Sequence, residues 1–175
     1  MKITLLLHNI RSTYNVGSIL RTADGFSVNH VIYSGYTPTP APYSTLLPHL
    51  SQKITTKIHK TALGAEQTLS SSYSENIIEE VQFLRSQGYQ IIGLENNLKD
   101  ARLHQITEHT LPGLIAPKVA LILGEEVEGI TSKLHQFIDL FLEIPMTGNK
   151  ESFNVSVATA IILFYLRYGI DLNRS

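Results

Sequence analysis

Residues 119–130 read Val-Ala-Leu-Ile-Leu-Gly-Glu-Glu-Val-Glu-Gly-Ile, an unbroken apolar run followed by three acids between two glycines. An apolar run without polar alternation is typical of a strand that is covered on both faces of a parallel sheet. The acids follow the carboxyl end of this strand, where open α/β sheets usually bind ligands. The stretch therefore predicts a buried strand that leads into a candidate site, although an acidic turn that needs two glycines would explain it equally well.

Similar apolar runs recur along the chain and are separated by segments with helical spacing. The expected strands are Ile3–Leu7, His30–Tyr33, Ile54–Ile58, Gln90–Leu94, Val119–Leu123 and Leu140–Ile144. Helices are expected over Val16–Gly25 and Glu75–Gln87, because their apolar residues fall on one stripe. The segment Ser34–Leu50 contains four prolines and is expected to be a loop with at most a short helix. This alternation predicts an α/β fold with a mainly parallel sheet flanked by helices.

Length and composition narrow the class of protein. A chain of 175 residues with 43% hydrophobic and 17% charged residues fits one folded domain. The formal net charge of -1 excludes a polybasic, histone-like binder. The absence of cysteine excludes disulfides, thiolate metal sites and cysteine nucleophiles.

The apolar segments are too short for a membrane protein. The run Ile3–Leu7 is shorter than the apolar core of a secretory signal. The longest apolar stretch, Val155–Leu166, has twelve residues, whereas a bilayer span needs about 20. We therefore expect a cytoplasmic protein with no membrane partner.

Basic residues are concentrated near the N-terminus. Residues 1–60 contain six lysines and arginines, and Asp24 is the single acid, which gives a formal charge of +5. A protein that is nearly neutral overall can therefore present a basic face. The same charges could also scatter over the surface as ordinary solvated groups.

Residues 9–23 carry more polar side chains than packing needs. They follow the first expected strand and open a helix, in which Asn15 is a candidate N-cap and Gly17 allows a close backbone approach. Arg21 falls outside the apolar stripe of this helix. An ordinary cap and a solvated charge would also explain Asn15 and Arg21.

Residues 144–158 join the last expected strand to the final helix. Ser152 and Asn154 are candidate caps of that helix. The helix itself is apolar nearly all round, which normally requires cover on two sides. One cover is the sheet of this chain, and we expect the other to be a second copy of the chain.

Together, in this order, the three segments resemble the signature motifs of the SpoU (TrmH-type) RNA 2′-O-ribose methyltransferases of the SPOUT superfamily. The first motif is matched by Asn15, Gly17, Ile19 and Arg21, the second by Gly124, Glu126 and Gly129, and the third by Ile144, Pro145, Met146, Ser152, Asn154, Ser156 and Ala158.

The resemblance implies a fold and a cofactor. It implies one SPOUT-type domain over residues 1–175 without an appended RNA-binding domain, a C-terminal deep trefoil knot, and a homodimer formed through the C-terminal helix. Such knots are nearly absent elsewhere. S-Adenosylmethionine would bind at Leu94, Gly124, Ile144, Met146, Ser152 and Phe153, and no metal is required.

The resemblance also implies roles in methyl transfer to a ribose 2′-hydroxyl of tRNA or rRNA. Its catalytic residues would be Arg21, Asn15, Glu126, Ser152 and Asn154. Arg21 would activate the hydroxyl, or it would hold the neighbouring phosphate and the developing alkoxide, since a guanidinium with a pKa above about 12 is a poor base. RNA would be bound by Arg11, Arg21, Lys53, Lys57 and Lys60.

Other functions remain open at this point. A methyltransferase of the same fold could modify a base, although the arginine of the first motif favours ribose. A knotted RNA-binding protein without activity is disfavoured by the intact polar residues of the three motifs. A small-molecule enzyme with the same α/β site would not bind RNA.

Overall fold

The computed structural model describes residues 1–96, 98–100, 102–106, 113–125 and 128–169. The strands are β1 (Lys2–His8), β2 (His30–Ser34), β3 (Ser71–Ser74), β4 (Gln90–Leu94), β5 (Leu103–Gln105), β6 (Lys118–Leu123) and β7 (Leu140–Glu143). The helices are α1 (Thr13–Gly25), α2 (Pro48–Ala62), α3 (Ala65–Thr68), α4 (Ile77–Ser86), α5 (Ser132–His135), α6 (Val155–Phe164) and the π-helical turn η1 (Tyr165–Gly169).

The seven described strands form one sheet in the order β3-β2-β1-β6-β4-β7-β5. Every neighbouring pair in this sheet is parallel. The predicted α/β fold with a mainly parallel sheet is confirmed. Strands β1 and β6 lie at its centre, paired from Lys2–Lys118 to Leu7–Leu123.

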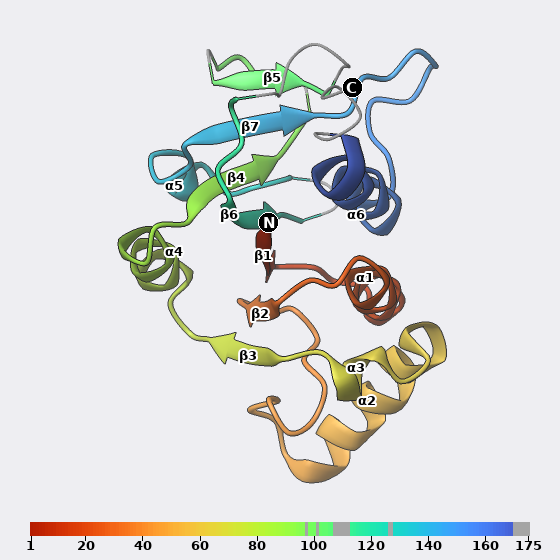
Figure 1. Cartoon of the computed structure of the whole chain (residues 1–175). Helices are drawn as coiled ribbons and strands as arrows, with labels where there is room; N and C mark the ends of the chain where they lie inside the picture. The colour runs from red at the N-terminus through yellow and green to blue at the C-terminus, as the bar shows by residue number, and fades with distance from the viewer. Residues whose placement is uncertain (97, 101, 107–112, 126–127, 170–175) are drawn as a thin grey trace.

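Helices cover both faces of the sheet, with α1, α2, α3 and α6 on one side and α4 and α5 on the other (Figure 1). Leu5 and Leu7 of β1 belong to the apolar cluster under α1 and α6, whereas Leu6 belongs to the cluster under α4. Because both faces are covered, β1 is buried from Ile3 to Leu7, and Thr4 is the one polar residue in that run.

The expected strand Ile54–Ile58 is wrong, because these residues lie in the middle of α2. Ile54 and Ile58 are four residues apart, so they share one helix face and pack into the cluster under α1. The intervening Thr55 and Thr56 favour strands by propensity, and tertiary packing overrides that preference here.

The expected N-cap of α1 is also wrong. The helix begins three residues earlier than Val16, and Ser12 is the N-cap, its hydroxyl accepting a hydrogen bond from the backbone N–H of Asn15 at 3.2 Å. Asn15 therefore lies within the first turn, where its side chain is available to the site. The close approach expected at Gly17 is confirmed, and the approaching backbone belongs to α2.

Other boundaries are closer to expectation. Helix α4 fills most of the expected Glu75–Gln87 segment, is capped by Asn76, and is followed by Gly88 in the left-handed region at φ 80°. Two short edge strands, β3 and β5, were not expected from the sequence. Within the part of the chain that the structure describes, no helix is long and apolar enough to cross a membrane.

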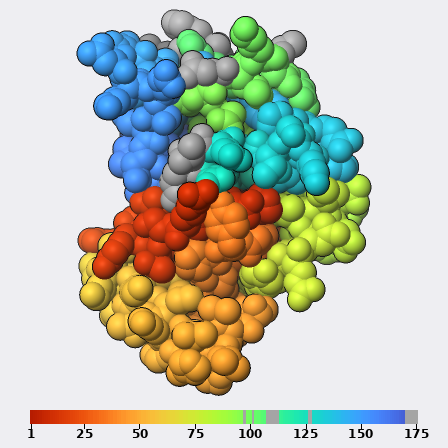
Figure 2. Space-filling view, turned by 180° about the vertical axis from the view of Figure 1, so that it is seen from behind, coloured from red at the N-terminus to blue at the C-terminus, as the bar shows by residue number. Residues whose placement is uncertain are grey.

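The two parts of the sequence occupy different ends of the molecule. Figure 2 shows the early residues, red to yellow, gathered at one end and the later residues, green to blue, at the other. Of the basic residues of the first third, Lys53, Lys57 and Lys60 lie on α2, whereas Lys2 begins the central strand β1.

Candidate functional site

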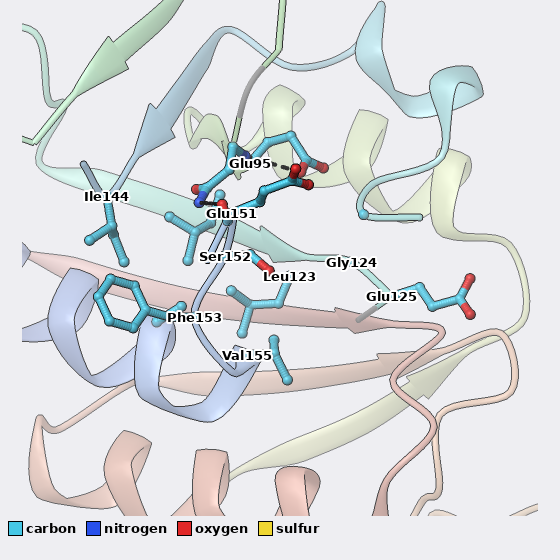
Figure 3. Close-up of a pocket in the computed structure, with 13 residues that line it drawn as sticks. Glu95, Leu123, Gly124, Glu125, Ile144, Glu151, Ser152, Phe153 and Val155 are labelled. Atoms are coloured by element: carbon cyan, nitrogen blue, oxygen red, sulfur yellow. Dashed lines mark hydrogen bonds between the residues drawn. The ribbon is translucent and has the colours of Figure 1, made fainter. Parts of the chain in front are cut away.

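A pocket of about 290 Å³ opens at the carboxyl edge of the sheet, where β4 and β6 end and the loop after β7 begins. Apolar side chains form much of its wall, among them Leu94, Ile144 and Phe153 (Figure 3). This is the edge at which open parallel sheets usually bind ligands. The volume is at the lower end of the range for small-molecule pockets, about 300–1,000 Å³.

The turn after β6 forms one wall of the pocket. Glu125 and Gly129 exchange two backbone hydrogen bonds of 3.0 Å across this turn. A Cβ at Gly124 would lie 2.4 Å from the Gly129 backbone, and a Cβ at Gly129 would lie 2.2 Å from the carboxylate of Glu95. Glycine is therefore required at position 124 by close backbone contacts and at position 129 by a positive φ of 68°.

The loop after β4 ties the other two loops together. The Glu95 carboxylate accepts a hydrogen bond from the Ile130 backbone N–H at 2.8 Å. The Asn96 side-chain amide donates to the Glu151 carbonyl at 3.0 Å. Residues that were not singled out in the sequence, Glu95 and Asn96, thus connect the second and third motifs.

The first and third motifs meet through two asparagines. The Asn154 side-chain amide donates to the side-chain oxygen of Asn15 at 3.2 Å, across 139 positions of sequence. Asn154 is the N-cap of α6 and also accepts from the Ser156 backbone N–H at 2.9 Å. One side chain therefore caps a helix and orients a neighbouring candidate site residue.

The first and second motifs meet through an ion pair between Arg11 and Glu125. The Arg11 side chain is 67% exposed, whereas that of Glu125 is only 9% exposed and lines the pocket. Figure 3 shows the Glu125 carboxylate directed away from the other labelled side chains. The ion pair thus connects a residue of the pocket wall, Glu125, to a residue of the outer surface, Arg11.

The pocket is acidic in character. Its lining contains Glu95, Glu125 and Glu151, and among its described lining residues there is no lysine or arginine. A mixed wall of apolar groups and carboxylates suits a ligand that combines an apolar body with positive charge.

A neutral imidazole lies at the end of β1. The His8 ring nitrogen Nδ1 is 2.9 Å from the Ser34 hydroxyl, and burial lowers the pKa of His8 below 6.5. Burial disfavours the charged form because the imidazolium loses its hydration. His8 therefore adds no positive charge to this edge near neutral pH.

Most residues expected at the cofactor converge. Leu94, Gly124, Ile144, Ser152 and Phe153 line the pocket. Met146, the sixth residue of this set, lines a neighbouring pocket of about 320 Å³ instead. The two pockets share Asn96 and Glu151, whose hydrogen bond separates them.

The residues expected in catalysis are only partly brought together. Asn15 and Asn154 are in contact, and Ser152 lines the pocket. Arg21 is exposed on α1, and among the described residues no hydrogen bond or ion pair is seen between it and these side chains. It lies six residues after Asn15, about 9 Å further along the helix axis. Glu126 lies outside the described residues.

Besides Arg21, the residues expected to bind RNA lie on helix α2 and in the loop between β1 and α1. Lys53, Lys57 and Lys60 are exposed on α2 at helical spacing, so they follow one face of that helix. We call these three residues the basic stripe. Arg11 is set apart from the stripe by its ion pair with Glu125.

The chain is similar to known RNA methyltransferases in sequence. A family model described as the SpoU rRNA Methylase family matches residues 2–164. A 23S rRNA (guanosine-2′-O-)-methyltransferase, RlmB, of Pectobacterium atrosepticum is 29% identical over 94% of this chain and 59% of its own length. A tRNA (guanosine(18)-2′-O)-methyltransferase of Borreliella burgdorferi is 28% identical over 94% of this chain and 65% of its own length.

Solved structures show the same fold. An AdoMet-bound rRNA methyltransferase from Sinorhizobium meliloti superposes with a TM-score of 0.73 at 22% identity, covering 95% of this chain and 56% of that one. The chain thus spans less than two thirds of the length of each of these three proteins.

Proposed function

The chain belongs to the SpoU rRNA Methylase family, and from this premise we propose that it transfers a methyl group from S-adenosylmethionine to a ribose 2′-hydroxyl of tRNA or rRNA. The observation that carries the proposal is that residues of the second and third motifs line one pocket, while two contacts hold the segment of the first motif beside them. Arg11–Glu125 joins the segment of residues 9–23 to the turn after β6, and Asn15–Asn154 joins the first motif to the third. The relatives named as guanosine 2′-O-methyltransferases support ribose as the methyl acceptor.

The pocket fits S-adenosylmethionine in chemical character. The cofactor has a purine with apolar faces and two cationic groups, the sulfonium and the amino group, which match the apolar side chains and the carboxylates of Glu95 and Glu151. Leu94, Ile144 and Phe153 would contact its apolar parts. The AdoMet-bound structural neighbour supports the same assignment. When bound, the cofactor supplies a methyl group that is already activated.

The remaining task of the protein is to place the hydroxyl and assist loss of its proton. The Asn15–Asn154 contact holds the first turn of α1 beside Asn154, whose chain neighbours Phe153 and Val155 line the pocket, and Asn15 would orient the hydroxyl from there. Arg21, exposed on the same helix, would hold the adjacent phosphate and stabilise the developing alkoxide, or accept the proton. The permanent charge of guanidinium favours the first of these roles.

The basic stripe would bind the RNA backbone. Helix α2 contains no acidic residue, and its lysines Lys53, Lys57 and Lys60 extend over about 10 Å of helix. Phosphate neutralisation by lysine supplies affinity without sequence preference. Because α2 packs directly on α1 at Gly17, the stripe is held at a fixed distance from Asn15 and Arg21.

We propose a homodimer formed through the C-terminal helix. Val157 of α6 is 46% exposed, Phe164 is 54% exposed, and Tyr168 of η1 is 52% exposed. Exposed apolar groups on one helical segment favour burial against a second copy. Size-exclusion chromatography with light scattering should give twice the chain mass of 19.5 kDa. A monomer at micromolar concentration would contradict the dimer.

The trefoil knot is part of the same proposal. It would involve the loops after β4, β6 and β7, and the supporting contacts are those of Glu95 with Ile130 and of Asn96 with Glu151. These hydrogen bonds bind the three loops to each other at the pocket.

The experiment is transfer of labelled methyl from S-adenosylmethionine to total bacterial RNA. Wild type, Arg21→Ala and Arg21→Lys are compared, with cofactor binding measured by calorimetry. We expect both variants to bind the cofactor as the wild type does and to lose nearly all transfer, because an ammonium lacks the planar fork of guanidinium. Transfer retained by Arg21→Ala would refute the role of Arg21.

A further inference from the structure

The Arg11–Glu125 ion pair lies between the two binding surfaces of the proposed enzyme. Glu125 lines the pocket, and the exposed Arg11 side chain belongs to the loop between β1 and α1. We propose that this pair transmits RNA binding to the cofactor pocket, so that each ligand tightens the binding of the other. The proposal rests on the proposed function, because it assumes that both ligands bind.

The arginine is suited to contact two anions. A guanidinium carries five N–H donors in one plane, so it can hold a carboxylate on one edge and a phosphate on another. The Arg11 side chain is 67% exposed while it is paired with Glu125, so an RNA phosphate can reach it without breaking the pair. Arg11 would thus act as a positioning residue between the RNA and Glu125.

Glu125 is suited to transmit the contact because its backbone forms the pocket wall. Its two hydrogen bonds with Gly129 close the turn after β6, so a shift of Glu125 is passed to Gly129. Gly129 lies against Glu95, and the next residue, Ile130, donates to that same carboxylate at 2.8 Å. The position of Glu125 therefore sets the positions of two further lining residues, Gly129 and Glu95.

Coupling follows from this connection. A phosphate on Arg11 restricts the guanidinium and, through the ion pair, restricts Glu125 and its turn. A cofactor that binds to the turn already restricted loses less conformational freedom on binding. By thermodynamic linkage the cofactor must then raise the RNA affinity by the same factor.

The test measures this factor without turnover. S-Adenosylhomocysteine is titrated by calorimetry into the protein alone and into the protein saturated with bulk bacterial tRNA or rRNA, whichever the wild type binds. We expect RNA to tighten binding by about 5-fold or more in the wild type, at the lower end of typical coupling. In Arg11→Ala and Glu125→Gln the ratio should fall to about 1, since each removes one half of the link.

Two further variants separate coupling from simple loss of charge. Lys53→Ala removes a basic-stripe contact, so it should weaken RNA binding but keep the wild-type ratio once RNA is saturating. Arg11→Lys keeps the charge without the fork, so its ratio should lie between those of the wild type and Arg11→Ala. Circular dichroism verifies that each variant is folded, as expected for changes at the exposed Arg11 and Lys53 and for the near-isosteric Glu125→Gln.

The outcomes distinguish this proposal from the proposed function. A wild type that binds S-adenosylhomocysteine and RNA with no mutual effect overturns the coupling and leaves methyl transfer standing. Coupling that persists in both Arg11→Ala and Glu125→Gln also overturns it. A wild type that binds neither ligand overturns the proposed function, and the coupling falls with it.

Discussion

Gly17 of α1 lies at the closest approach between the site helix and the helix that carries the basic stripe. A Cβ at this position would lie 2.2 Å from the Thr61 hydroxyl oxygen and 2.3 Å from the Ile58 carbonyl oxygen. Ordinary contacts of a Cβ begin at 3.4 Å. Thr61 can change rotamer, but the Ile58 carbonyl is backbone, so Gly17→Ala requires α2 to retreat by about 1 Å.

The cost can be estimated from similar changes. Overpacking a well-packed contact costs about 1–3 kcal/mol, and the better helix propensity of alanine returns about 1 kcal/mol. We expect a net loss of up to about 2 kcal/mol in the free energy of unfolding. For a chain of this size that lowers the unfolding midpoint by up to about 8 °C.

The matched control is Gly25→Ala at the end of the same helix, where an added Cβ meets nothing within 4 Å. It should stabilise the protein by about 0.4–1 kcal/mol, because alanine restricts the unfolded chain. Urea unfolding of wild type and both variants measures the two effects, and RNA affinity should fall in Gly17→Ala alone. Equal stability of the two variants would refute the helix contact as the reason for glycine at position 17.

Two further predictions concern salt and pH. Replacing all three lysines of the basic stripe with alanine should reduce the slope of log K for RNA against log salt by about 2–3, as measured by fluorescence anisotropy. Lys118→Ala, at the amino end of β6 and so at the end of the strand away from the pocket, should leave the slope unchanged. An unchanged slope in the triple variant would exclude the stripe from the interface. Burial raises the pKa of Glu66. Hydrogen bonds from the His59 ring at 2.6 Å and from the Gly64 amide at 3.1 Å lower this pKa by more than burial raises it, so that it lies below 4.5. A carboxyl group whose pKa is lower in the folded chain than in the unfolded chain stabilises the fold at any pH above the unfolded pKa. In urea unfolding, the stability advantage of wild type over Glu66→Gln should therefore shrink as the pH falls below 4.5. An advantage independent of pH from 3 to 7 would contradict the ionised state of Glu66.

The buried strands could be predicted from the sequence because their apolar runs lack the polar alternation of a half-exposed strand. The strands expected at β1, β2, β4, β6 and β7 all occur, with ends that differ by at most one residue. Each lies between two helical layers and is apolar on both faces. The edge strands β3 and β5 escaped prediction because Ser71–Ser74 is polar and Leu103–Gln105 has only three residues.

The strand predicted at Ile54–Ile58 shows where propensity misleads. Isoleucine and threonine favour strands, yet the spacing of Ile54 and Ile58 is that of one helix face. Pro48 at the first helical position and the lysines at helical intervals were further signals for α2. The correction matters for function, because only a helix places the three lysines on one face.

The site was only partly accessible from the sequence. The three motifs identified Gly124, Ser152 and Asn154, and the fold brings all three to one edge. Glu95 and Asn96 were missed, although they directly follow the predicted strand Gln90–Leu94 and so lie at the same carboxyl edge. The contacts between loops depend on side chains up to 139 positions apart, which no local pattern encodes.

The central claim is that the methyl group is placed on ribose. RNA methylated by the wild-type protein is digested to nucleosides, and mass spectrometry assigns the added mass to the sugar or the base. We predict a nucleoside with the methyl group on the 2′-oxygen, made by the wild type and absent with Arg21→Ala. A methyl group on a base, or no transfer to any RNA by a protein that binds the cofactor, would contradict the proposed function.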